Sequence, residues 1–232
     1  MVPSFTDRTM NRREVTALLA TFALAACGGG GSDTGALASG GTTALRPPAT
    51  PSISLWGDSL IPPLSVALQM DFPDRQIFNG GVAGDTSSQV LQRFQADTTH
   101  RDWITVFWFG HNNLKQDASS AAQVKADLAA MVAGLAPGND DFVVLSILND
   151  ATLALRGTAL YDIEMALNAD LQALYPAQYL DIRSLLVAQG DAADQANDVP
   201  ASMFRVDEIH LNGAGSQFAA DRIKALFNSR GW

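Results

Sequence analysis

Short apolar runs alternate with amphipathic stretches from residue 52 to the end of the chain. The runs are apolar at successive positions, as in strands buried on both faces of a parallel sheet. They cover residues 52–56, 75–79, 104–109, 142–147 and 178–182. Between and after them, patterns typical of helices cover residues 60–71, 86–96, 119–135, 158–174 and 213–227. This alternation predicts an α/β fold, with a five-stranded parallel sheet covered by helices on both faces.

The N-terminal residues show a different pattern. Three arginines within residues 1–14 precede an apolar run at 15–26, whose 12 residues are too few to span a bilayer but typical of a signal peptide core. The run ends in Leu-Ala-Ala-Cys, which resembles the lipobox of bacterial lipoproteins. This resemblance implies a lipid on Cys27, and Gly28 in place of aspartate implies the outer membrane. An ordinary signal peptide that contains a cysteine is the alternative.

Export and tethering follow from the same region. The adjacent arginines at 12–13 partly match a twin-arginine signal, so the export route is open between this pathway and the general secretory one. Glycine, serine, threonine and proline dominate residues 28–51 without periodicity, which predicts a flexible tether. We therefore expect a signal peptide over 1–26, the lipidated cysteine and linker over 27–51, and one folded domain over 52–232.

Composition narrows the classes of function. The 232 residues are 47% hydrophobic and 17% charged, which suits a globular domain with a substantial core. The formal net charge is −9 without a basic cluster, so we expect no nucleic-acid partner. One cysteine and three histidines predict neither an internal disulfide nor a zinc site. No metal or organic cofactor is expected.

Polar segments follow three of the predicted strands, and a fourth precedes the last helix. In parallel α/β sheets the reactive groups collect at the carboxyl ends of the strands. We therefore expect the four segments to meet at one edge of the sheet. They are Gly-Asp-Ser-Leu at 57–60, Asn-Gly-Gly-Val-Ala-Gly-Asp-Thr-Ser at 79–87, Gly-His-Asn-Asn at 110–113 and Asp-Glu-Ile-His at 207–210.

The residue types in these segments are those of a serine-hydrolase site. Ser59 would be the nucleophile, His210 the general base, and Asp207 the carboxylate that orients His210. Gly84 lets its backbone N–H approach a bound carbonyl closely, and Asn112 offers a side-chain amide. Together with the N–H of Ser59, these donors would form an oxyanion hole.

The four blocks resemble those of the SGNH hydrolases, also called GDSL lipases and esterases. The family is named after the serine, glycine, asparagine and histidine that correspond to Ser59, Gly84, Asn112 and His210. The resemblance runs from about residue 53 to the C-terminus and implies a flavodoxin-like α/β/α sandwich. In the family the third block usually ends in aspartate, whereas this chain has Asn113, so the hydrogen bonds around Asn112 are expected to differ.

Several of these residues have simpler interpretations. Ser59 could cap a helix, and Asp58 is expected to hold its loop through backbone hydrogen bonds. Gly80 and Gly81 are predicted in a turn. For His111 two interpretations stay open, contact with substrate and packing beside Trp108. His100, in a polar loop, is expected at the surface.

The sequence as a whole predicts an exported, lipid-anchored serine esterase that acts on short-chain acyl or O-acetyl esters, including those of polysaccharides. Hydrolysis of lysophospholipids or thioesters is the alternative within the enzymes. Outside the enzymes, the alternative is a surface binding protein that has kept the same fold but has lost catalytic turnover. The segment 187–203 is acidic and poor in apolar residues, unlike the large apolar lid of a lipase, which argues against long-chain triglycerides as substrates. A surface loop unrelated to specificity is the alternative interpretation of this segment.

Overall fold

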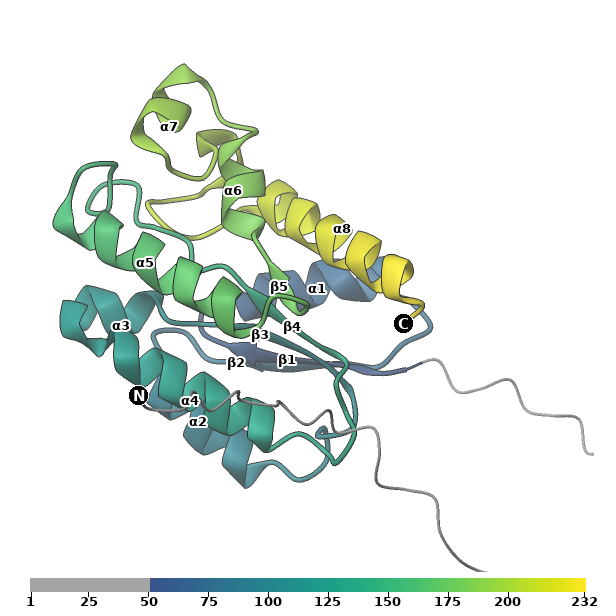
Figure 1. The fold of residues 1–232 in the computed structure, drawn as a ribbon. Coiled ribbons are helices and arrows are strands. Elements are labelled where there is room, and N and C mark those ends of the chain that lie inside the picture. Colours follow the sequence, from purple (N-terminus) through teal and green to yellow (C-terminus); the bar gives the residue numbers. More distant parts are fainter. Residues whose placement is uncertain (1–50) are drawn as a thin grey trace, which may run out of the picture. The chain divides into compact units, whose positions relative to one another are not determined.

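Five parallel strands form the centre of the structure, a computed structural model that describes residues 51–232 (Figure 1). The strands lie in the order β2-β1-β3-β4-β5. Their bounds are β1 (Ile53–Gly57), β2 (Ile77–Gly81), β3 (Ile104–Trp108), β4 (Phe142–Leu145) and β5 (Tyr179–Leu180). In the register, Ile53 of β1 lies beside Ile77 of β2 and Ile104 of β3.

Helices cover both faces of this sheet, which confirms the predicted α/β/α sandwich. One face carries α1 (Ile61–Asp71) and α8 (Gly213–Arg230), with α6 (Ile182–Val187) beside α8. The other face carries α2 (Ser87–Ala96), α4 (Ala121–Ala133) and α5 (Ala159–Leu174), with α3 (His111–Gln116) packed against α5. The remaining elements are α7 (Ala192–Asn197) and the 3₁₀ turns η1 (Ala118–Ser120) and η2 (Ser202–Phe204).

Two hydrophobic cores lie on opposite faces of the sheet, because successive side chains of a strand point to opposite faces. In β3, Val106 belongs to the core under α1 and α8, whereas Phe107 belongs to the core under α2, α4 and α5. The strands are therefore buried on both sides, as their unbroken apolar runs predict.

The ends of the helices follow signals in the sequence. Pro62 and Pro63 occupy the first turn of α1, where the missing N–H has no intrahelical acceptor. Thr86 is the N-cap of α2, and its backbone N–H donates to Gln89 Oε1 at 2.8 Å. Asn212 caps α8 by accepting from Gly215 N at 2.9 Å.

The structure corrects two expectations and adds three short helices. Gly80 and Gly81 are not in a turn but belong to β2, in register with Trp56 and Gly57. The helices α3, α6 and α7 have six residues each, too few for a helical period to be visible in the sequence. His100 is half-buried rather than at the surface, since its ring stacks on Phe78 with the centroids 3.8 Å apart.

The predicted signal peptide, the linker up to residue 50 and Cys27 lie outside the described residues. Within residues 51–232, no helix combines the length and the apolar character needed to cross a membrane.

Candidate active site

The four polar segments meet at the carboxyl edge of the sheet. Ser59 follows β1, Asn112 lies in the first turn of α3, and Asp207 and His210 precede α8. Ser59, Asn112 and His210 line one pocket of about 80 Å³. Gly84 lies in the loop after β2, next to Asp85, whose carbonyl oxygen accepts a hydrogen bond from Asn112. The predicted site residues that the structure describes therefore belong to four separate segments and lie at one edge of the sheet.

Ser59, His210 and Asp207 are hydrogen-bonded in series. Ser59 Oγ lies 2.9 Å from His210 Nε2, and His210 Nδ1 lies 2.7 Å from Asp207 Oδ2. Ser59 does not cap α1, since the N-cap is Leu60 and has no side-chain bond. The hydroxyl is thus free to interact with the imidazole.

A small hairpin fixes the mutual orientation of Asp207 and His210. Arg205 and Leu211 form an antiparallel bridge, and Val206 N donates to His210 O at 2.9 Å. Asp207 Oδ1 accepts from the backbone N–H groups of His210 at 2.7 Å and Ile209 at 2.9 Å. Burial opposes ionisation of Asp207, but these bonds and the His210 ring outweigh it and lower its pKa to about 2. Asp207 is therefore a carboxylate at neutral pH.

Close packing at the end of β1 requires the glycine before Asp58. A Cβ on Gly57 would lie 1.9 Å from the carbonyl oxygen of Trp108 in β3. The next residue, Asp58, is buried, and its Oδ1 accepts from Leu60 N at 3.1 Å. Asp58 thus holds the Ser59 loop through a backbone hydrogen bond, as expected.

Asn112 already has acceptors for its amide. Its Nδ2 donates to Asp85 O at 3.0 Å and, more weakly, to Asp58 Oδ2 at 3.5 Å. The longer contact is the one that a substrate oxygen can replace at least cost. Gly84 has a φ of +81°, which is strained for residues with a Cβ, and an added Cβ would meet no atom within 4 Å. This glycine is therefore required by conformation rather than by space.

Asn113, the departure from the usual third block, has a defined role. Its Oδ1 accepts from Ser87 N at 2.7 Å, and its Nδ2 donates to Ser87 Oγ at 2.9 Å. Ser87 Oγ in turn donates to Asp127 Oδ2 of α4 at 2.6 Å. This chain therefore has an amide at position 113, where the family usually has a carboxylate. The carboxylate of Asp127 is linked to Asn113 through the hydroxyl of Ser87.

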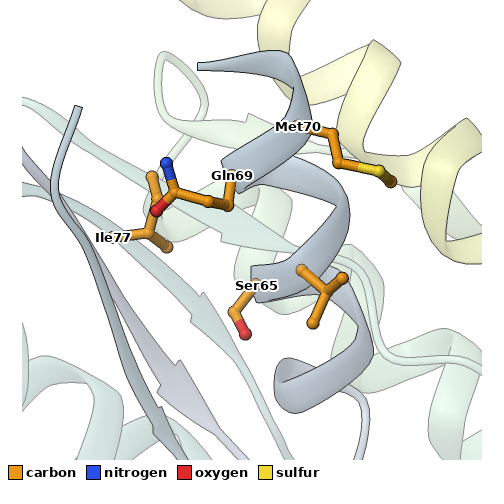
Figure 2. A pocket seen from close by; sticks show the side chains of 5 residues that line it. Ser65, Gln69, Met70 and Ile77 are labelled. Atoms are coloured by element: carbon orange, nitrogen blue, oxygen red, sulfur yellow. The ribbon is translucent and has the colours of Figure 1, made fainter. Parts of the chain in front are cut away.

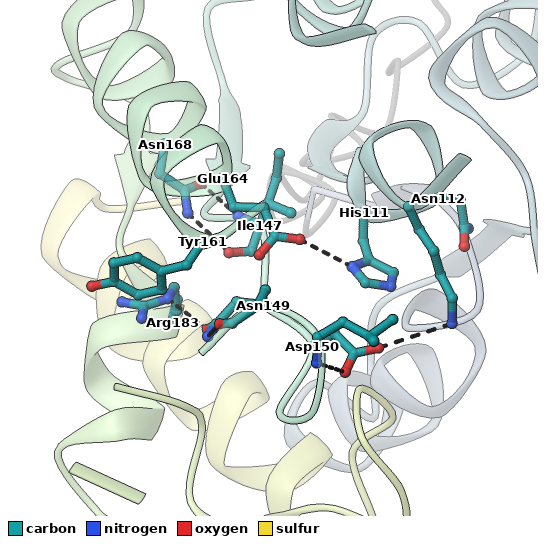
Figure 3. Close-up of polar contacts among 12 residues, drawn as sticks. His111, Asn112, Ile147, Asn149, Asp150, Tyr161, Glu164, Asn168 and Arg183 are labelled. Atoms are coloured by element: carbon teal, nitrogen blue, oxygen red, sulfur yellow. Dashed lines mark hydrogen bonds and ion pairs between the residues drawn. The ribbon is translucent and has the colours of Figure 1, made fainter. Parts of the chain in front are cut away.

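His111 lines the pocket beside Asn112 and is itself buried. Its Nδ1 lies 3.4 Å from Oε1 of Glu164, a fully buried residue of α5 (Figure 3). Burial raises the pKa of Glu164, and the nearby His111 offsets part of that rise. A buried carboxylate–imidazole pair thus lies directly behind the pocket.

Two positioning residues were not predicted from the sequence. Arg93 of α2 donates to Asp85 Oδ2 at 2.8 Å, Gly80 O at 2.5 Å and Gly57 O at 3.1 Å, so it links the ends of β1 and β2. No pattern in the sequence marks it. Glu164 could have been found, because it shares the buried stripe of α5 with Leu167 and Leu171 at helical spacing.

A larger groove lies elsewhere, along α1 and the edge strand β2 (Figure 2). Its volume is about 360 Å³, and the side chains lining it are Ser65, Val66, Gln69, Met70 and Ile77. None of these can act as a general base, so this groove is not the candidate active site.

A serine, a histidine and a carboxylate hydrogen-bonded in series on an α/β/α sandwich have the arrangement of a serine hydrolase. Residues 38–218 match the sequence model of the GDSL-like Lipase/Acylhydrolase family. The match covers most of the chain, so the protein belongs to this family and is an ester-hydrolysing serine hydrolase. A comparison with curated proteins found no match.

Solved structures of related fold support the architecture. A lipase/acylhydrolase from Enterococcus faecalis is 16% identical with a TM-score of 0.62, over 78% of this chain and 97% of that one. The acetyl xylan esterase AlAXEase is 16% identical with a TM-score of 0.60, over 75% and 98%. The psychrotrophic esterase EstA from Pseudoalteromonas sp. is 15% identical with a TM-score of 0.58, over 78% and 98%. At these identities the likeness shows the fold alone.

Proposed function

We propose that this protein is a serine esterase that hydrolyses short-chain acyl or O-acetyl esters through an acyl-enzyme. The observation that carries the proposal is the continuous series of contacts from Ser59 Oγ through His210 to Asp207, at 2.9 and 2.7 Å. These distances are short enough for proton transfer between the hydroxyl and the imidazole.

The reaction would proceed in two steps. Ser59 Oγ attacks the ester carbonyl carbon while His210 Nε2 takes the hydroxyl proton, and the C–O bond to the alcohol breaks as His210 returns that proton to the leaving oxygen. Water then attacks the acyl-enzyme with the same base and releases the acid. Asp207, ionised at neutral pH, stabilises the imidazolium that forms in each step.

Three N–H donors would stabilise the oxyanion that develops in both steps. They are the backbone N–H groups of Ser59 and Gly84 and the Nδ2 of Asn112. Of the two bonds that Asn112 makes, the one to Asp85 O at 3.0 Å keeps the amide oriented. The 3.5 Å contact to Asp58 would be exchanged for the oxyanion.

The character of the pocket supports small acyl groups. Seven of its nine lining residues are polar, and only Leu60 and Ile209 are apolar. A long acyl chain needs an apolar cavity to replace water. A relative of the same fold is named as an acetyl xylan esterase, which is consistent with O-acetyl esters of polysaccharides as substrates.

Variants of Ser59 and His210 test the proposal. We expect Ser59→Ala and His210→Ala each to lower kcat by about 10³-fold or more, and the double variant to be little worse, because the members act as a unit. Hydrolysis of p-nitrophenyl acetate, butyrate and palmitate measures both this loss and the chain-length preference. Additive losses in the double variant would contradict the assignment.

A fluorophosphonate probe tests the nucleophile independently of turnover. We expect a covalent adduct on Ser59, located by mass spectrometry; EstA, of similar fold, is inhibited by monoethylphosphonate. Folded protein with neither adduct nor turnover would favour a non-catalytic binding protein instead.

Lysophospholipid or thioester hydrolysis is the second candidate, favoured by one observation. Met203 and Val206, just before Asp207, are 66% and 68% exposed, and such side chains can contact lipid. A preference for palmitate over acetate would support this candidate.

A further inference from the structure

Buried polar atoms without partners are concentrated behind the active-site pocket. Within residues 51–232, nine buried side-chain nitrogen and oxygen atoms have no hydrogen-bond partner in the protein. Five of the nine belong to three neighbouring side chains: both ring nitrogens of His111, both carboxylate oxygens of Glu164, and Oδ2 of Asp150. Because buried polar groups are nearly always hydrogen-bonded, this concentration indicates a place where a further polar group binds.

His111 connects this cluster to the pocket (Figure 3). It is 5% exposed and lines the same pocket as Ser59 and His210, while its Nδ1 faces Glu164 Oε1 at 3.4 Å. The pocket therefore has two imidazoles, each backed by a carboxylate. His210 is hydrogen-bonded to Ser59, whereas within residues 51–232 the ring of His111 makes no hydrogen bond and has Glu164 as its ion-pair partner.

Charged groups from several elements lie around His111. Glu164 of α5, Asp150 from the loop after β4 and Asp58 from the loop after β1 are negative when ionised. Lys115, one turn further along α3, lies 3.9 Å from Asp150 Oδ2 and also lines the pocket. Arg183 of α6 provides a positive charge that favours the ionised form of Glu164.

The group that fits this cluster is a hydroxyl. No set of three or more His, Cys, Asp or Glu side chains in the described part of the chain is arranged to hold a metal ion. Lys115, a donor, and Glu208, an acceptor, line the same pocket as His111. A hydroxyl both donates and accepts, so it can satisfy such a mixed set.

The alcohol part of the ester would bring that hydroxyl. His210 must return a proton to the leaving oxygen, so the alcohol lies beside His210. Since His210 and His111 line one pocket of about 80 Å³, an alcohol held beside His210 lies in the same pocket as His111.

We propose that His111, oriented by Glu164, binds a hydroxyl of the alcohol part and thereby selects esters of polyols, such as partly acylated sugars, over esters of simple alcohols. The inference rests on the proposed esterase function and assigns the substrate class of the same site. A site built to bond a hydroxyl discriminates strongly against an analogue that lacks it.

The test compares two acetates of the same size. In 2-hydroxyethyl acetate a hydroxyl takes the place of the terminal methyl group of propyl acetate. We expect the unmodified protein to prefer the hydroxyl ester by at least about tenfold in kcat/KM. A hydrogen bond to an imidazole that is paired with a carboxylate contributes about that much. We expect His111→Gln to lower this preference about tenfold or more, and Glu164→Gln to lower it in the same direction by less.

His100 provides the matched control. It too is a histidine paired with a carboxylate, since its Nδ1 lies 2.7 Å from Asp97 Oδ2, but it is not among the residues that line the pocket. His100→Gln should leave the ratio of the two kcat/KM values unchanged. If thermal melting shows that His111→Gln is unfolded, the double variant H111Q/E164Q provides the same test without an unpaired buried carboxylate.

The outcomes separate the two proposals. Equal rates on the two acetates for the unmodified protein, or an unchanged preference in His111→Gln, would overturn the role of His111 while fluorophosphonate labelling of Ser59 still supports the esterase. Absence of both labelling and turnover in the unmodified protein would overturn the esterase proposal, and this inference with it.

Discussion

Asp58 shows how a charge can be placed beside a nucleophile at a cost to stability. It is 2% exposed, and burial raises its pKa to about 6, although the bond from Leu60 N and the nearby His111 and His210 oppose the rise. Its neutral form is therefore better accommodated in the folded protein than its carboxylate. The stability associated with protonated Asp58 is fully present below its unfolded pKa of 3.8 and is lost as the pH rises through about 6.

Replacing Asp58 by asparagine removes this pH dependence. We expect Asp58→Asn to unfold with a free energy higher by up to about 3 kcal/mol at pH 8, and with little difference at pH 4. Urea denaturation at the two pH values measures the effect. The same difference at both would show that ionisation of Asp58 is not its cause.

At the scale of single residues, the sequence predicts which residues form the site better than it predicts the hydrogen bonds between them. Ser59, Asp207 and His210 are predicted because their residue types and their places after a strand or before a helix are visible along the chain. The bonds of Asn112 to Asp85 and Asp58 could not be predicted, since they depend on how three loops meet in space. Glu164 shows an intermediate case, because its helical spacing is visible but its partner is not.

At the scale of the elements, one hydrogen-bonded chain joins α2, α3 and α4. Asn113 of α3 both donates to and accepts from Ser87 of α2, and Ser87 donates to Asp127 of α4. Asp127 also accepts from Ser88 at 2.8 Å and Gln123 at 2.7 Å. This arrangement has one carboxylate, and the hydroxyl of Ser87 has one proton to donate.

Restoring the usual aspartate at position 113 should therefore destabilise the protein. In Asn113→Asp, two carboxylates would compete for the Ser87 proton, and we expect a loss of about 1–3 kcal/mol in the free energy of unfolding. Adding Asp127→Asn should recover part of the loss. Urea denaturation of both variants and of Asp127→Asn alone gives the coupling between the two positions. Losses that simply add would argue against a shared proton.

The predicted elements differ from the observed ones mainly where segments are short. The strand β2 begins at Ile77 rather than at residue 75 and continues through Gly80 and Gly81, because glycine is a weak strand former and gives no apolar signal. The strand β5 has only Tyr179 and Leu180. The predicted start of the long helix α5 differs from the observed one by one residue, whereas that of α4 differs by two.

At the scale of the whole molecule, we propose that the protein is exported and held in the cell envelope by a lipid on Cys27, in the outer membrane. The net charge of −9 provides no attraction to anionic lipids, so the acyl chains would supply the anchoring.

Substituting the cysteine tests this proposal. In a bacterial host, we expect the unmodified chain to incorporate labelled palmitate and to sediment with membranes. Cys27→Ser should do neither, because it lacks the thiol to be acylated. A protein that is never labelled, or a serine variant that still sediments with membranes, would contradict lipid anchoring through this residue.

The two hydrophobic cores have a consequence for how this site can change. Ser59, Asp207 and His210 precede α1 and α8, which pack on one core, whereas Gly84, Asn112 and His111 belong to segments packed on the other. The sheet separates the support of Ser59, Asp207 and His210 from that of Gly84, Asn112 and His111, the side-chain and loop groups that we propose to contact the substrate. Repacking under α3 and α5 can therefore alter substrate choice during evolution or engineering while the nucleophile and its base keep their geometry.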